Sequence, residues 1–98
     1  MYQINVYQKH IHGLDVLSSH PIESEMDMHE FRHHAYRYVF DGNPIIVEII
    51  INADKEYAQI AKIKIVWNAK MLWNAIKTYF DRRAAAFGYC EVFNDNED

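Results

Sequence analysis

The sharpest chemical pattern in this sequence is His29-Glu30-Phe31-Arg32-His33, which follows the order H-E-x-x-H. On a helix, histidines four positions apart lie on one face and can bind the same zinc ion, while the glutamate between them can act as a base on zinc-bound water. His29 and His33 are therefore candidate zinc ligands, and Glu30 is a candidate general base. One interpretation of the chain is a zinc-dependent hydrolase that uses the HEFRH stretch.

Three features weaken this interpretation. Arg32 places a cation between the two candidate ligands, where it would repel a metal ion. If residues 25–35 form a strand instead of a helix, His29 and His33 lie too far apart to share a metal. The resemblance to metallopeptidases is confined to five residues, and no second helix supplies an obvious third ligand, although Glu48 or His20 could be brought near. We therefore expect no catalytic residue and no cofactor, with zinc kept as the alternative, and we favour a non-catalytic protein over an enzyme.

Other reactive side chains form no recognisable set. Cys90 is the only cysteine, so an internal disulfide is excluded, and we expect its thiol to be a small buried apolar group. His10 and His12 would share one face of a strand, but beside a turn at Gly13 we expect both to be exposed. The sequence contains no glycine-rich phosphate loop and no arrangement that indicates a nucleophilic triad.

The net charge is −4, but positive charge gathers in one stretch, residues 62–83. Aromatic and basic residues are interleaved there: Lys62, Lys64, Trp67, Lys70, Trp73, Lys77, Tyr79, Phe80, Arg82 and Arg83. Such a mixture is typical of surfaces that bind single-stranded nucleic acid, so a nucleic-acid-binding module is a second alternative. The acidity of the whole chain argues against it, and the spacing of the aromatic residues favours a core face.

The elements that must position these residues include several strands. Alternating or continuous apolar residues predict strands at 2–11, 45–51, 57–67 and 89–93. Residues 14–24 are ambiguous, because Pro21 favours a loop in their middle.

Residues 24–40 allow two interpretations. Ser24 and Asp27 have the spacing of a capping box, and the apolar residues after them follow helical spacing. Alternatively, the later part of this stretch alternates and leads into a strong turn signal, which predicts a strand at 33–41 paired in a hairpin with residues 44–52. We favour the hairpin, with at most a short helical turn before it.

The strongest helical signal covers residues 69–87, where apolar side chains recur at three- and four-residue steps. Asn68 is a suitable N-cap, and Gly88 suits the C-terminal end. We expect the helix to bury its apolar stripe against the sheet: Leu72, Ile76, Tyr79, Phe80 and Phe87 against Ile49, Ile51, Ile63 and Ile65.

These elements predict a single α+β domain over residues 1–93. Its antiparallel, meander-like sheet of four to five strands would carry one long C-terminal helix on one face. No run of about 18 apolar residues supports a membrane span, and the N-terminus lacks the layout of a signal peptide, so a cytoplasmic location is expected. Residues 94–98 are expected to form a disordered acidic tail.

Seven tyrosines and two tryptophans exceed what one small core readily hides, and exposed aromatic residues are typical of protein interfaces. The leading interpretation is therefore a small non-catalytic protein-interaction module of accessory, inhibitor or adaptor type, for example a phage or mobile-element inhibitor of a host protein. Its partner would be another protein or a second copy of the chain, as a homodimer. The candidate contact residues lie beside the capping box and on the polar face of the long helix: Glu23, Glu25, Asp27, Glu30, Lys70, Trp73 and Lys77.

Overall fold

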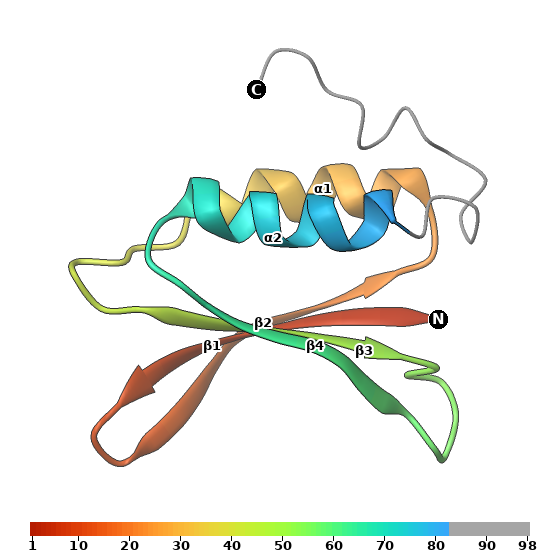
Figure 1. The fold of residues 1–98 in the computed structure, drawn as a ribbon, viewed down its shortest axis with the longest axis horizontal. Coiled ribbons are helices and arrows are strands. Elements are labelled where there is room, and N and C mark those ends of the chain that lie inside the picture. Colours follow the sequence, from red (N-terminus) through yellow and green to blue (C-terminus); the bar gives the residue numbers. More distant parts are fainter. Residues whose placement is uncertain (83–98) are drawn as a thin grey trace.

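Strands and helices follow one another as two consecutive ββα units over residues 1–82, the part of the chain that the computed structural model describes (Figure 1). In chain order, the elements are β1 (Tyr2–His10), β2 (Gly13–Ile22), α1 (Glu25–Ala35), β3 (Ile45–Ile51), β4 (Gln59–Val66) and α2 (Ala69–Asp81). The predicted α+β class is confirmed. The described part contains four strands, and two helices where the sequence predicted one.

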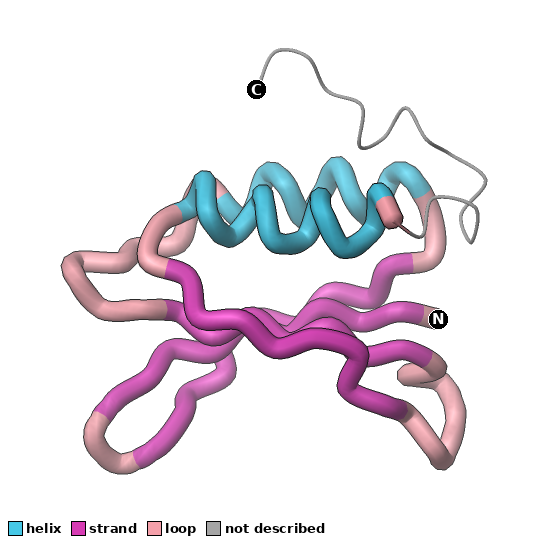
Figure 2. The backbone as a smooth tube through the Cα atoms, in the orientation of Figure 1, coloured by secondary structure: helices cyan, strands magenta, loops and turns pink. Residues whose placement is uncertain are grey.

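The sheet has the order β2-β1-β3-β4, and all neighbouring strands are antiparallel. The predicted meander is therefore wrong, because the chain passes through α1 and returns beside β1 instead of β2. Both helices lie side by side on one face of the sheet, and the two hairpin ends bend away from the helix layer (Figures 1 and 2). The sheet thus has one face covered by helices and one face that no described residue covers.

The two ββα units are related by an approximate two-fold axis between the central strands β1 and β3. Each hairpin contains one register shift between its strands. Ile22 and Val66 end the two outer strands and are both fully buried, and Ser24 and Asn68 are the N-caps of the two helices. The sequence shows no internal repeat because these equivalent positions share roles in burial and capping, while most residue types differ.

The ambiguous stretch 14–24 contributes most of strand β2 in spite of Pro21. β2 is an edge strand, and at an edge the missing N–H of a proline can face away from the sheet without losing a ladder hydrogen bond. Sequence reasoning weighed Pro21 as a loop signal because it had no means of placing the strand at an edge.

The predicted hairpin between residues 33–41 and 44–52 is wrong, because α1 continues to Ala35 and the rest of the first segment forms a turn and irregular chain. Its start is fixed by the capping box: the Ser24 hydroxyl accepts a hydrogen bond from the Asp27 N–H at 3.3 Å, and the Asp27 carboxylate accepts one from the Ser24 N–H at 3.1 Å. The helix buries three apolar residues, Met28, Phe31 and Ala35. Their burial holds residues 25–35 in the helix, and the alternating residues 36–40 follow it as a turn and irregular chain.

Helix α2 begins where predicted, with the Asn68 side chain accepting a hydrogen bond from the Met71 N–H at 2.8 Å. Its last helical residue is Asp81, so it is shorter than the predicted helix 69–87. Four predicted contact residues are confirmed as buried: Leu72, Ile76, Tyr79 and Phe80. Phe87, Gly88, Cys90, the predicted strand at 89–93 and the predicted tail at 94–98 lie outside the described residues.

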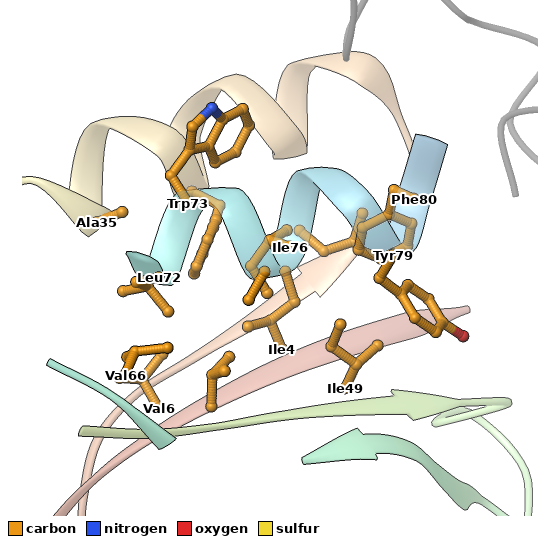
Figure 3. Close-up of a cluster of buried hydrophobic side chains, with 14 of the residues drawn as sticks. Ile4, Val6, Ala35, Ile49, Val66, Leu72, Trp73, Ile76, Tyr79 and Phe80 are labelled. Atoms are coloured by element: carbon orange, nitrogen blue, oxygen red, sulfur yellow. The ribbon is translucent and has the colours of Figure 1, made fainter. Parts of the chain in front are cut away.

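The core fills the space between the helices and the covered face (Figure 3). Strands β1 and β3 supply alternate residues, such as Ile4 and Ile49, both 0% exposed. The Trp73 ring lies near the Phe31 ring at 6.5 Å between centroids and joins the two helices. Among residues 1–82, no helix has the length and apolarity to cross a membrane.

Candidate functional site

The face of the sheet that points away from the helices, here called the open face, is apolar and solvent-accessible on β3, β4 and part of β2, and polar along β1. The strand registers align one row across all four strands: Tyr7 lies opposite Val16 and Ile46, and Ile46 lies opposite Ile65. Antiparallel partners point to the same side of a sheet, so these side chains form a continuous strip. Val16 is 63% exposed and Ile65 is 48% exposed, whereas the apolar residues of the core are at most 7% exposed.

Strand β4 presents its isoleucines to the open face, which corrects the prediction that Ile63 and Ile65 pack under α2. Val47 lies under the helices and pairs with Lys64, so the Lys64 side chain points to the helix side of the sheet. Because side chains alternate along a strand, Ile63 and Ile65 point to the open face. Ile63 is consequently 56% exposed. The alternation of β4 defines two faces but does not say which face the helices cover. Of the predicted partners in β3, Ile49 is buried and Ile51 is partly buried.

A chain of hydrogen bonds crosses the centre of the open face. The Gln3 amide donates to the Asn5 side-chain oxygen at 2.8 Å, and the Asn5 amide donates to Glu48 Oε1 at 3.0 Å. The Tyr7 hydroxyl donates to the same Oε1 at 2.8 Å. Burial, followed by this hydrogen bond and the charge of Glu48, raises the pKa of Tyr7, so the phenol remains a donor. The network holds the Glu48 carboxylate in one position.

Isoleucines surround this carboxylate. Ile63 lies directly across the strand pair from Glu48, and Ile46 and Ile50 flank it along β3 on the same face. Within residues 1–82, no lysine, arginine or histidine forms an ion pair with Glu48. The open face therefore combines an apolar surface with one fixed negative charge.

The HEFRH stretch is helical, as zinc binding would need, and its Phe31 points into the core while His29, Glu30 and His33 lie on the outer side of α1. His29, Glu30 and His33 are exposed and, with His34, line a shallow hollow on the helix surface. His29 Nε2 lies 3.7 Å from a carboxylate oxygen of Glu25. In the described part of the chain, no three histidine, cysteine, aspartate or glutamate side chains are grouped so that they could hold a metal ion. The geometry supplies two histidines without a third protein ligand.

A histidine cluster that sequence reasoning missed lies between β2 and α1. His20 Nε2 is 2.8 Å from the Ser18 hydroxyl and 3.2 Å from the Tyr38 hydroxyl, and these two hydroxyls are hydrogen-bonded to each other. The His20 ring also contacts Phe31 and lies 5.0 Å from the His34 ring. Burial, and then the neighbouring His34, lower the pKa of His20. The cluster links β2 to the connection after α1, and its only sequence signal was the S-x-H spacing in an ambiguous stretch.

Two of the four predicted acidic contact residues already have partners within the fold. Asp27 accepts hydrogen bonds from the backbone of Glu23 and Ser24, so its carboxylate serves the helix cap. Glu25 lies beside His29, while the side chains of Glu23 and Glu30 are exposed.

The three predicted contact residues of α2 do not form one exposed surface. Lys70 is exposed and Lys77 is partly buried, but Trp73 is only 2% exposed. The Arg32 guanidinium lies 5.3 Å from the centre of the Trp73 ring. Trp73 is thus a core residue that holds α1 and α2 together, and it offers no edge to a partner.

The basic stretch gathers three cations at the β4 edge on the helix side. Lys62 lies near Lys64 and Arg82, and burial, followed by their charges, lowers the pKa of Lys62. The aromatic residues that would stack on bases are mostly in the core: Trp73, Tyr79 and Phe80 are buried, and Trp67 is 53% exposed. A stacking platform for nucleic acid is not assembled by the described residues.

Comparison with protein-family models, with curated proteins and with solved structures found no match to this chain.

Proposed function

We propose that this chain is a small non-catalytic protein-interaction module that binds another protein through the open face of its sheet. The observation that carries the proposal is the exposure of large apolar side chains on that face, among them Val16, Ile60, Ile63 and Ile65. A contiguous apolar surface of this kind is typical of protein–protein interfaces and is seldom left bare in a monomer. Such a module would act as an accessory, adaptor or inhibitor protein.

The charge distribution supports this surface over the other parts of the fold. Lys62 and Lys64 point to the helix side, because they pair with the buried residues Ile49 and Val47. Interface centres are depleted of charge, and Glu48 is the charged side chain at the centre of the open face. The strands are fixed by their ladders and supported by the packed helices, so a partner would meet a preformed surface and pay little ordering entropy.

The two hairpin ends extend this surface. Both bend toward the open side of the sheet (Figure 1), and each carries an exposed apolar residue, Ile11 at 93% and Tyr57 at 65%. A partner seated on the open face would lie between these ends and could contact both of them.

The test is affinity capture from the native cell with three forms of the chain. Ile65→Lys places a charge on the open face, and Val39→Lys makes a similar change at an exposed position in the connection between α1 and β3. We expect the wild type and Val39→Lys to capture the same protein, and Ile65→Lys to lose it while unfolding at the same urea concentration. Capture that survives Ile65→Lys, or that is lost equally with both variants, would contradict the proposal.

A further inference from the structure

The Glu48 carboxylate carries a negative charge on the open face, and a purely apolar partner surface would supply no counter-charge for it. Its Oε1 atom already accepts hydrogen bonds from Asn5 and Tyr7. Its Oε2 atom accepts none from the described residues. A partner that covers Ile46, Ile50 and Ile63 removes the water around this carboxylate, and a desolvated charge without a counter-charge is costly.

We propose that the surface recognised by the open face carries one arginine or lysine surrounded by apolar side chains, and that this cation pairs with Glu48. This inference rests on the proposed function and names the chemistry of the partner. The hydrogen bonds from Asn5 and Tyr7 hold the carboxylate before binding, so the pair forms with little loss of side-chain entropy. The isoleucines around it exclude water and strengthen the attraction.

A second copy of this chain fits the open face less well. Two open faces packed about their centres would bring two Glu48 carboxylates toward each other, and like charges at a buried contact are repulsive. Lys62 and Lys64 cannot relieve this, because they point to the opposite face of the sheet. Lys9 shares the open face with Tyr7, but it lies toward the hairpin end of β1, four positions beyond Asn5, the residue opposite Glu48. The charge therefore favours a foreign partner with a central cation.

The experiment selects binders from a display library of random dodecapeptides on the immobilised wild-type chain, with Ile65→Lys as the counter-selection. Glu48→Gln keeps an oxygen for Asn5 and Tyr7 but removes the charge. We expect selected peptides to contain one arginine or lysine among large apolar residues. Their affinity should fall roughly tenfold or more on Glu48→Gln. Replacing the peptide's base by a neutral residue of similar length should cause the same loss, and the two changes together should cost little more than either alone.

Each other outcome has a defined meaning. Selected peptides without a basic residue, or with a base whose affinity is unchanged by Glu48→Gln, would overturn this inference and leave the proposed function standing. Peptides that bind Ile65→Lys as well as the wild type would count against the proposed function itself. Light scattering that shows a dimer of the 11.7 kDa chain, dissociated by Ile65→Lys, would make a second copy the occupant and would also overturn the inference.

Discussion

Ile49 and Ile63 belong to adjacent strands of one sheet, yet Ile49 is 0% exposed under the helices and Ile63 is 56% exposed on the open face. The covered face gains its stability from burial, and a hydrogen-bonding cluster around His20 lies at its margin. The open face instead surrounds a fixed carboxylate with apolar side chains that stay in contact with water. The comparison shows that similar hydrophobic strands can serve the core or a partner, depending on which face the helices cover.

The largest expected effect comes from placing the same substitution on the two faces. Ile49→Thr should lower the free energy of unfolding by about 2–4 kcal/mol, because it leaves a cavity and buries a hydroxyl. Ile63→Thr keeps the β-branched shape at an exposed site, and its effect should be within about 0.5 kcal/mol. Urea unfolding followed by circular dichroism measures both. Equal losses for the two variants would show that the open face is not exposed in solution.

A smaller effect is expected from loosening the helix layer that covers one face. Ser24→Ala removes the hydroxyl that accepts the Asp27 N–H hydrogen bond and should cost about 1 kcal/mol of stability. Ser19→Ala is the matched control, because Ser19 is exposed and its change should stay within about 0.5 kcal/mol. Binding through the open face should survive Ser24→Ala, whereas Ser19 lies opposite Asn5 on that face, so Ser19→Ala is a control for stability only. Loss of binding with Ser24→Ala in a folded protein would place the contact on the helix side.

The smallest effect is a pH dependence at the margin of the covered face. The pKa of His20 is lowered in the folded chain from an ordinary value of 6.5. As the pH falls below 6.5, the unfolded chain therefore takes up a proton more readily, and stability decreases. His20→Gln should weaken this decrease, whereas His29→Gln, whose side chain is 55% exposed, should leave it in place. Urea unfolding between about pH 7.5 and 5.5 makes the comparison. Identical pH dependence in the wild type and His20→Gln would rule out this role.

Local signals were sufficient for much of the fold. The alternation of β1, the continuous apolar run of β3, the alternation of β4 and the capped apolar stripe of α2 each predicted their element. For α1, the capping box of Ser24 and Asp27 indicates a helix, while the alternation of residues 36–40 favours a strand. Burial of Phe31 decided between the two interpretations, and burial is a property of the assembled fold.

The open face could not be predicted for the same reason. The sequence of β4 separates Lys64 from Ile63 without showing which of them lies under the helices. The pairing of Asn5 with Glu48 joins residues 43 positions apart, and no local pattern encodes it. The predicted contact residues were chosen for charge and exposed aromatic character, but Trp73 is needed in the core and Asp27 in a cap.

The most direct test of the account observes the isoleucine δ1-methyl groups by NMR while the captured partner, or a selected peptide, is added. Ten of the twelve isoleucines divide between the open face and the core under the helices. The open-face set is Ile46, Ile50, Ile60, Ile63 and Ile65, and the covered set is Ile4, Ile22, Ile45, Ile49 and Ile76. The account predicts that signals of the open-face set shift or broaden while those of the covered set change little. Shifts confined to the covered set, or no shift in the open-face set of a saturated complex, would contradict it.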